Sequence, residues 1–344
     1  MALGQIAFLG SGETSRAGGA IFEQLARALP DPPRIAILET PAGFELNSHQ
    51  VAGRVADFMR LRLQNYNPVI DVIPARKRGT AFSPDEAELL RPLASANFIF
   101  MGPGSPTYAI RQLQGSLAWD LIRARHRLGA ALAFASSATI AVGAWGLPVY
   151  EIYKVGQDVH TVRGLDLFND FGAEVSFIPH WNNAEGGDDV DTSRCFVGME
   201  RFAIWCGSLP PENTTVGLDE HTGLIIDFEK RTCLVNGVSS VSLVRDCDPR
   251  IFPAGASFPL GELGVLSPPE LPQSGISPRA WQMATDAAQP MDMGPGPEVL
   301  ALAAQRQQAR SKGSWGESDR LRAKIADLGW NVQDTKDGQQ LVRR

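Results

Sequence analysis

The stretch Ala131-Leu-Ala-Phe-Ala-Ser-Ser-Ala-Thr-Ile-Ala-Val-Gly143 sets two serines among small residues, between an apolar strand and an apolar helix. A serine on such a tight strand-to-helix turn adopts a strained backbone conformation, and only small residues two positions away leave room for the chain around it. Around Ser137 those two positions hold Ala135 and Thr139, where the usual pattern has glycine. The segment predicts a nucleophile elbow centred on Ser137. The alternative is an Ala/Ser-rich strand-to-helix junction that carries no chemistry.

Residues 1–145 alternate short apolar runs with longer amphipathic ones, which is typical of successive βα units around a parallel sheet. We expect strands at Gln5–Leu9, Arg34–Leu38, Val69–Ile73, Asn97–Met101 and Ala131–Phe134. We expect helices at Gly18–Leu29, Ser48–Leu63, Pro84–Leu93 and Ser116–Leu128. The pattern predicts an α/β fold with a doubly wound, flavodoxin-like parallel sheet over residues 1–248.

The loops after three of these strands consist of small or turn-forming residues. They are Gly10-Ser-Gly12, Gly102-Pro-Gly104-Ser-Pro106 and Ala135-Ser-Ser137. Because ligands bind outside the carboxyl ends of the strands in open α/β sheets, these loops predict one shared crevice. Neither Gly-x-x-x-x-Gly-Lys-Ser/Thr nor Gly-x-Gly-x-x-Gly occurs at the end of the first strand, so nucleotide binding is the weaker interpretation and we expect no cofactor.

The rest of the chain changes character twice. β-branched runs predict short strands at Leu224–Asp227, Thr232–Val235 and Ser240–Leu243, with a helix near Thr192–Ile204. Frequent prolines predict a linker or wrapping arm over residues 249–296. Residues 297–344 are expected to form a small helical hairpin from Glu298–Ser311 and Ser318–Leu328.

The composition is that of an ordinary globular protein with a formal charge of −6. Nine basic and six acidic side chains follow residue 296, so a mildly basic tail follows an acidic body; the tail either has a separate role or consists of solvated helix faces. The four cysteines form no Cys-x-x-Cys pair, which argues against a zinc site and against a disulfide scaffold. We expect no leader and no membrane span, and we expect a reduced, cytoplasmic protein without a metal.

A serine nucleophile needs a base, and imidazole is the usual one. His180 is the candidate because Phe177-Ile-Pro-His180 places it directly after an apolar strand, at the edge where the crevice should lie. A carboxylate must then orient the imidazole. Glu220, at another strand end, is the first candidate, and Glu151 and Asp158 are the alternatives.

The developing oxyanion would need backbone N–H donors. The N–H of Ala138, at the start of a helix, and that of Gly104 or a neighbour in its loop are the candidates.

The order of these segments resembles the dipeptidase E and cyanophycinase family of serine peptidases, within the class I glutamine amidotransferase-like superfamily. The resemblance covers roughly residues 5–244. The segments that carry it are Leu9-Gly-Ser-Gly12, Phe98-Ile-Phe-Met-Gly-Pro-Gly-Ser105, the elbow at Ser137, Pro179-His-Trp-Asn-Asn183 and Gly217-Leu-Asp-Glu-His-Thr222.

The resemblance implies a Ser-His-Glu triad, which falls on Ser137, His180 and Glu220, and an acyl-enzyme mechanism on a small peptide or amide. It implies substrate contacts from the crevice loops at Gly12, Ser105, Asn182 and Asn183, and from Arg194 or Arg201 on the helix expected after the histidine loop. The elbow carries no cysteine, so glutaminase chemistry is not implied. The charged residues by which cyanophycinases recognise arginine side chains are absent around Ile178 and Pro179, which disfavours cyanophycin as the substrate.

The last 40 residues or so resemble the carboxyl-terminal helical tail of cysteinyl-tRNA synthetases. The matching segments are Arg306-Gln-Gln-Ala-Arg310, Trp315-Gly-Glu-Ser-Asp-Arg-Leu-Arg322, Leu328-Gly-Trp330 and Val332-Gln-Asp-Thr-Lys-Asp-Gly338. This resemblance implies contact with tRNA or with a translation component, and the alternative is a hairpin used for packing or homodimerisation. A catalytically inactive ligand-binding or tRNA-associated protein is therefore the alternative to a serine hydrolase.

Overall fold

The computed structural model describes residues 3–288, 297–335 and 338–343. The chain divides into two compact units, Met1–Ala288 and Gln289–Arg344. The expected boundaries at 248 and 296 differ from this division, because residues 249–288 are part of unit 1. The remainder of the expected linker, residues 289–296, lies outside the described residues.

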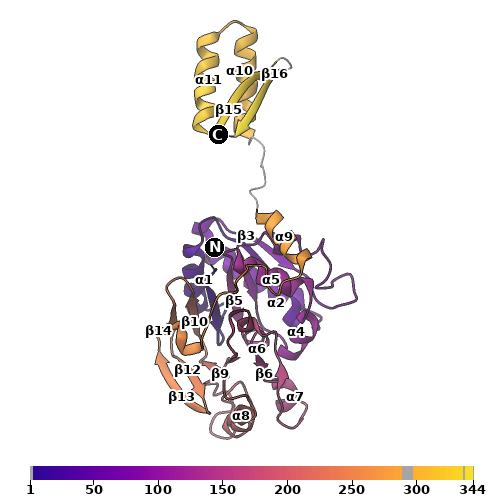
Figure 1. Cartoon of the computed structure of the whole chain (residues 1–344), viewed down its shortest axis with the longest axis vertical. Helices are drawn as coiled ribbons and strands as arrows, with labels where there is room; N and C mark the ends of the chain where they lie inside the picture. Colours follow the sequence, from indigo (N-terminus) through magenta and orange to yellow (C-terminus); the bar gives the residue numbers. More distant parts are fainter. Residues whose placement is uncertain (1–2, 289–296, 336–337, 344) are drawn as a thin grey trace. The chain divides into compact units, whose positions relative to one another are not determined.

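A large sheet forms the centre of unit 1 (Figure 1), in the order β14-β11-β10-β1-β5-β4-β2-β3. Five of its strands are parallel: β1 (Ile6–Leu9), β2 (Arg34–Leu38), β3 (Val69–Ile73), β4 (Phe98–Met101) and β5 (Ala131–Ala135). Three antiparallel strands extend it: β10 (Thr222–Asp227), β11 (Thr232–Gly237) and β14 (Ser257–Pro259). The strands β3-β2-β4-β5 lie side by side as the strands 2-1-3-4 of a flavodoxin-like sheet do. The next place is held by β1, the first strand of the chain, and not by a later strand. The fold is therefore a mixed α/β sheet that reproduces the expected topology in part.

Helices cover both faces of this sheet because its parallel strands are apolar on both sides. Phe98-Ile-Phe-Met101 shows this, since all four side chains are buried and alternate between two cores. One face packs against α1 (Arg16–Ala28) and α2 (Ser48–Arg62). The other packs against α3 (Arg91–Ser95), α4 (Pro106–Leu113), α5 (Leu117–Arg127), α6 (Ser137–Ala141) and α9 (Pro278–Ala288).

A second, four-stranded sheet has the order β13-β12-β9-β8. Its strands are β8 (Val175–Ile178), β9 (Thr214–Leu218), β12 (Ser240–Arg245) and β13 (Asp248–Pro253). β8 and β9 are parallel, so both end at the same edge. The stack of Phe8 in β1 on Phe177 in β8, with 3.9 Å between ring centroids, joins this sheet to the large one.

The smaller elements of unit 1 lie in the connection that leads to the second sheet and within that sheet's first connection. β6 (Trp145–Gly146) pairs with β7 (Val162–Arg163), and the short helix α7 (Val149–Tyr153) lies between them in the sequence. α8 (Gly198–Gly207) precedes β9. A disulfide joins Cys206 of α8 to Cys247, whereas Cys195 and Cys233 are free and buried. The sequence argued against a disulfide scaffold, and this one pair is a correction to that expectation.

Two expected helices differ from the structure for local reasons. The helix expected at Pro84–Leu93 is confined to Arg91–Ser95, because Pro92 lacks an N–H and fits only in the first turn of a helix. The helix expected near Thr192–Ile204 begins at Gly198, because three consecutive residues before it, Arg194, Cys195 and Phe196, have positive φ angles. The expected linker also contains regular structure, since β13, β14 and α9 pack into unit 1.

Unit 2 combines two helices with a β-hairpin. Its elements are α10 (Pro297–Ser311), α11 (Trp315–Asp327), β15 (Trp330–Thr335) and β16 (Gly338–Arg343). The helices occur where the sequence predicts them, but the hairpin was not expected. Val299, Ala303, Ile325 and Val332 form a small core of their own. The buried Arg306 forms two 2.9 Å bonds with the Asp334 carboxylate, so its charge is paired.

None of the helices in the described ranges has the length and apolar character that a membrane crossing requires. Within the same ranges there is no cluster of three or more potential metal ligands.

We expect the contact between the two sheets to contribute strongly to stability. Replacing Phe8 by alanine removes a fully buried ring that packs on Phe134, Phe168 and Phe177, and should cost about 3–5 kcal/mol in the free energy of unfolding. The same replacement at the partly exposed Phe82 should cost about 1 kcal/mol or less. Urea denaturation of both variants checks this, and equal losses would show that the stack does not hold the sheets together.

Candidate active site

Three side chains from different strand ends form a continuous hydrogen-bonded chain. Ser136 Oγ lies 3.1 Å from His180 Nε2, and His180 Nδ1 lies 3.1 Å from Glu220 Oε1. Ser136 follows β5, His180 follows β8 and Glu220 follows β9. The His180 and Glu220 side chains keep 18% and 31% of their surface exposed, so the group can be reached from solvent.

The serine in this group is Ser136, not the predicted Ser137. β5 extends one residue further than expected, to Ala135, so the turn centres on Ser136. Ser137 is the first residue of α6, is 5% exposed, and donates its hydroxyl hydrogen to Gly102 O at 3.1 Å. Its side chain therefore points into the protein, and the neighbour carries the accessible hydroxyl.

The backbone of Ser136 has the strain expected of a nucleophile elbow. Its φ of 53° and ψ of −121° are rare for a residue with a side chain. The turn is held to the end of β1, because Leu9 O accepts hydrogen bonds from Ser136 N at 3.3 Å and from Thr139 Oγ1 at 3.3 Å. Thr139 thus anchors α6 to β1.

The predicted N–H donors for an oxyanion need one correction. Ala138 N already donates to Gly102 O at 3.3 Å, so it is not available. Because the elbow is one residue earlier, Ser137 N takes its place at the start of α6. Within the described ranges, Ser137 N and Gly104 N have no hydrogen-bond partner. Gly104 has a φ of 148° and a backbone so close to Pro41 O that a Cβ would lie 2.0 Å from it. Only glycine fits there.

The loop after β1 holds the other two members in place. Gly10 O accepts a hydrogen bond from His180 N at 3.2 Å. A Cβ on Gly10 would lie 2.2 Å from Asp219 O, so the absence of a side chain lets the loop that carries Glu220 pass close by. His180 itself has a φ of 50°, which adds a second strained residue to the site.

Asn182 and Asn183, for which substrate binding stays a prediction, both contact Glu220. Asn183 Nδ2 donates to Glu220 Oε1 at 2.9 Å, and Asn182 Oδ1 accepts from Glu220 N at 2.8 Å. Burial alone would raise the pKa of the Glu220 carboxyl. Hydrogen bonds from Asn183 and His180, together with the charges of His180 and His221, outweigh burial, so the pKa is lowered from its ordinary value of 4.5. The two asparagines therefore position an ionised carboxylate.

Neither alternative carboxylate contacts His180 in the described part of the chain. Glu151 Oε1 accepts a hydrogen bond from Thr107 Oγ1 at 2.6 Å. The backbone oxygen of Asp158 lies 2.9 Å from His160 Nδ1. Glu220 is the carboxylate that the structure brings to His180.

The remaining predicted binding residues have other surroundings. Gly12 faces the His221 imidazole, where a Cβ would lie 2.3 Å from Nδ1. Arg194 stacks on the Trp181 ring at 3.9 Å and donates to Trp181 O, so it supports the histidine loop. Ser105 caps α4 by accepting from Tyr108 N at 3.2 Å, and it also lines a cavity.

That cavity, of about 550 Å³, lies beside the strand-end loops. Its lining includes Phe44, Ser105, Tyr108, Tyr150 and Glu151. Ring contacts connect this cavity with the triad. The Phe196 ring contacts the His180 ring and stacks on the Tyr153 ring, and the Lys154 ammonium lies over the rings of both Tyr153 and Tyr150. Glu151 Oε2 is buried there without a hydrogen-bond partner in the described part of the chain.

Comparisons with known proteins bear on the two units separately. Residues 294–341 match the family described as the cysteinyl-tRNA ligase anticodon binding domain. The chain is similar to the crystal structure of a peptidase from an acI-B1 Actinobacterium, with a TM-score of 0.60 and 19% sequence identity over 75% of this chain and 97% of that one. It is also similar to a putative peptidase E protein from Listeria monocytogenes EGD-e, with a TM-score of 0.45 and 13% identity over 69% of this chain and 100% of that one.

A comparison with curated protein sequences gives no match. The likeness to the actinobacterial peptidase shows that this chain has the same fold as that protein.

The bond from Asn183 to Glu220 gives a pH-dependent prediction. Because the pKa of Glu220 is lower in the folded protein than its ordinary value of 4.5, the ionised carboxylate stabilises the folded state. This stabilisation is complete above pH 4.5 and is lost as the pH falls through the lowered pKa. Asn183→Ala should therefore destabilise the protein more at pH 7 than at a pH below the lowered pKa of Glu220, because the carboxylate that accepts the Asn183 bond is ionised only at the higher pH. Denaturation midpoints at both pH values measure this, and a pH-independent loss would contradict the assigned bond.

Proposed function

We propose that unit 1 is a serine hydrolase of the dipeptidase E and cyanophycinase type, which cleaves a small peptide or amide through Ser136, His180 and Glu220. The observation that carries the proposal is the pair of 3.1 Å contacts that links hydroxyl, imidazole and carboxylate in the order of a catalytic triad. The strained backbone of Ser136 and the fold shared with a peptidase support it.

In the proposed reaction, each of the three side chains has one role. His180 Nε2 removes the hydroxyl proton as Ser136 Oγ attacks the carbonyl carbon, and Glu220 accepts the Nδ1–H bond and stabilises the imidazolium. The carbonyl oxygen becomes an oxyanion, which accepts hydrogen bonds from Ser137 N–H and from the loop at Gly104. The imidazolium then gives its proton to the leaving nitrogen as the C–N bond breaks, and an ester to Ser136 remains. Water, deprotonated by His180, attacks this ester and releases the acid.

Cys195 is the other nucleophilic residue near the triad, since its N–H donates to His180 O at 3.1 Å. Burial, together with the charge of Glu220, raises the pKa of its thiol to about 12. It therefore stays protonated at neutral pH, and a thiol is a weak nucleophile in that state. This leaves Ser136 as the nucleophile.

A fluorophosphonate probe tests the assignment without knowledge of the substrate, because it labels activated serines. We expect Ser136→Ala to abolish labelling. Ser137→Ala, the matched control at the adjacent position, should keep its labelling rate within about tenfold of the wild type, since it loses one hydrogen bond to Gly102. Labelling that survives in Ser136→Ala, or that disappears in Ser137→Ala alone, would contradict the proposal.

A second proposal concerns unit 2, which we infer to contact RNA. The match of residues 294–341 to an anticodon-binding family supports it. Its surface also has an exposed aromatic residue next to a cation, because the Arg310 guanidinium lies 5.4 Å from the centroid of the Trp315 ring, and Trp315 is 60% exposed. Bases stack on such rings, and cations contact the phosphates.

This second proposal is tested by binding of labelled tRNA to the full chain and to a chain that ends at residue 288. The full chain should bind with an affinity that falls steeply with salt, and the shortened chain should lose most of that affinity. Equal binding by both chains, or no binding by the full chain at low salt, would overturn it.

A further inference from the structure

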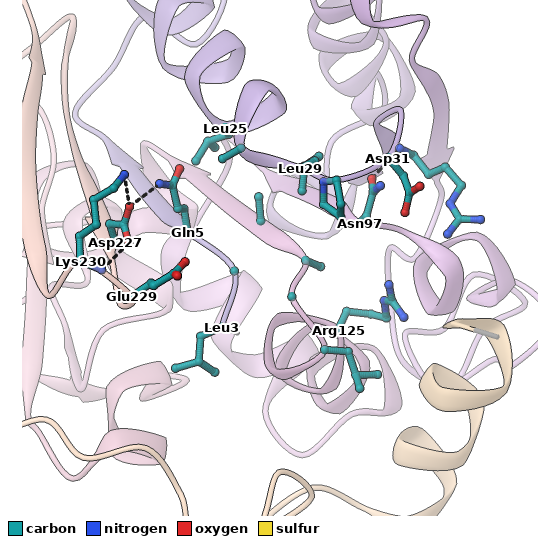
Figure 2. A pocket seen from close by; sticks show the side chains of 18 residues that line it. Leu3, Gln5, Leu25, Leu29, Asp31, Asn97, Arg125, Asp227, Glu229 and Lys230 are labelled. Atoms are coloured by element: carbon teal, nitrogen blue, oxygen red, sulfur yellow. Dashed lines mark hydrogen bonds and ion pairs between the residues drawn. The ribbon is translucent and has the colours of Figure 1, made fainter. Parts of the chain in front are cut away.

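A second cavity, of about 630 Å³, lies at the opposite edge of the large sheet from Ser136. Gln5, Arg34, Asn97 and Ala131 line it, and each stands at or just before the amino end of a parallel strand. Figure 2 shows the side chains around it. Ser136 follows the carboxyl end of β5 in the same sheet, so the cavity and the triad serine are separated by the length of the strands.

Arg125, in the last turn of α5, is the buried cation of this cavity, with 4% of its surface exposed. Nε donates to Ala96 O at 2.7 Å and Nη1 donates to Ala284 O at 3.2 Å. These carbonyls fix the plane of the guanidinium. Nη2 has no hydrogen-bond partner in the described ranges, and it keeps some contact with solvent. One nitrogen of a rigid, buried guanidinium is therefore open to the cavity.

No carboxylate in the described part of the chain neutralises Arg125. Burial is the main cause that lowers the pKa of Arg125, to about 10, and the like charge of Arg34 lowers it further. Arg34 is exposed, lines the same cavity and forms no ion pair within the described ranges. A buried guanidinium beside a second positive charge is costly to the fold unless an anion accompanies it.

Two of the three acidic residues that line the cavity, Asp227 and Glu229, lie apart from the arginine pair. Asp227 is engaged by Lys230 Nζ at 3.0 Å and by Gln5 Nε2 at 2.8 Å, and in Figure 2 these residues and Glu229 lie on the far side of the cavity from Arg125. Asp31 is the carboxylate on the arginine side, and it is exposed and forms no ion pair among the described residues. The arginine end is thus the cationic end.

We propose that this cavity is a binding site for a small molecule that carries an oxyanion, with a phosphate or carboxylate group bound between Arg125 Nη2 and the Arg34 guanidinium. Guanidinium groups donate charge-assisted hydrogen bonds to both kinds of oxyanion. The apolar side chains of Leu3 and Leu29, which also line the cavity, would contact the rest of the ligand. This site is independent of the serine chemistry.

Calorimetric titration of the full chain with inorganic phosphate, and in parallel with acetate, tests the site at constant ionic strength. We expect saturable binding of at least one of the two ions, and the stronger one identifies the ligand class. Arg34→Gln should weaken binding about tenfold, the effect of one lost charge-assisted bond. Arg60→Gln removes an exposed arginine of α2 paired with Asp57 and is the matched control, with unchanged binding.

Two further variants make the outcome decisive. Ser136→Ala should bind the ion as tightly as the wild type, which excludes the triad as the place of binding. Arg125→Lys keeps the charge but loses the fork, and should bind at least as weakly as Arg34→Gln. If Arg125→Lys fails to fold, Arg34→Gln decides alone, because its side chain makes no bond within the described structure. Absence of saturable binding of both ions, or wild-type affinity in Arg34→Gln, would overturn the proposal.

Discussion

Strand β1 is the element on which the rest of the structure depends, because its carboxyl end holds two members of the triad by backbone bonds and lies against the loop of the third. It pairs with β5 on one side and β10 on the other. Leu9 O holds the elbow at Ser136, and the next carbonyl, Gly10 O, holds His180. Glu220 reaches the same point because Gly10 has no side chain. A shift of one residue in β1 would move its side chains to the opposite face of the sheet and displace the carbonyls that make these bonds.

The sequence predicted the framework of this arrangement better than its details. Continuous apolar runs identified the five parallel strands, and two of them, β2 and β3, have the predicted bounds. The elbow was placed one residue too late, because Ser136 and Ser137 are adjacent and both have small neighbours. The distinction lies in the end of β5, since Ala135 still pairs with Leu9 and the chain can turn only afterwards. Propensity does not resolve strand ends to one residue.

Side-chain roles were harder to predict than positions. His180 and Glu220 were identified as strand-end residues, but nothing in the order of residues shows that Asn182 and Asn183 turn back toward Glu220. That contact follows from positive φ angles at His180 and at His221, which depend on packing rather than on local preference. Strained residues at a site that the rest of the fold holds in place are typical of functional sites, where local rules are broken and core packing compensates.

The disulfide between Cys206 and Cys247 gives the three triad members different covalent surroundings. The two cysteines are 41 positions apart, so the bond closes a ring that contains β9 to β12 and Glu220, whereas Ser136 and His180 lie outside it. Such a ring lowers the conformational entropy of the unfolded chain, which raises the free energy of the unfolded state by about 4 kcal/mol. Even when unfolded, the oxidised chain therefore keeps β9 to β12 and Glu220 within one closed ring. Ser136 and His180 lie outside the ring, so their approach to Glu220 is not restricted by the disulfide.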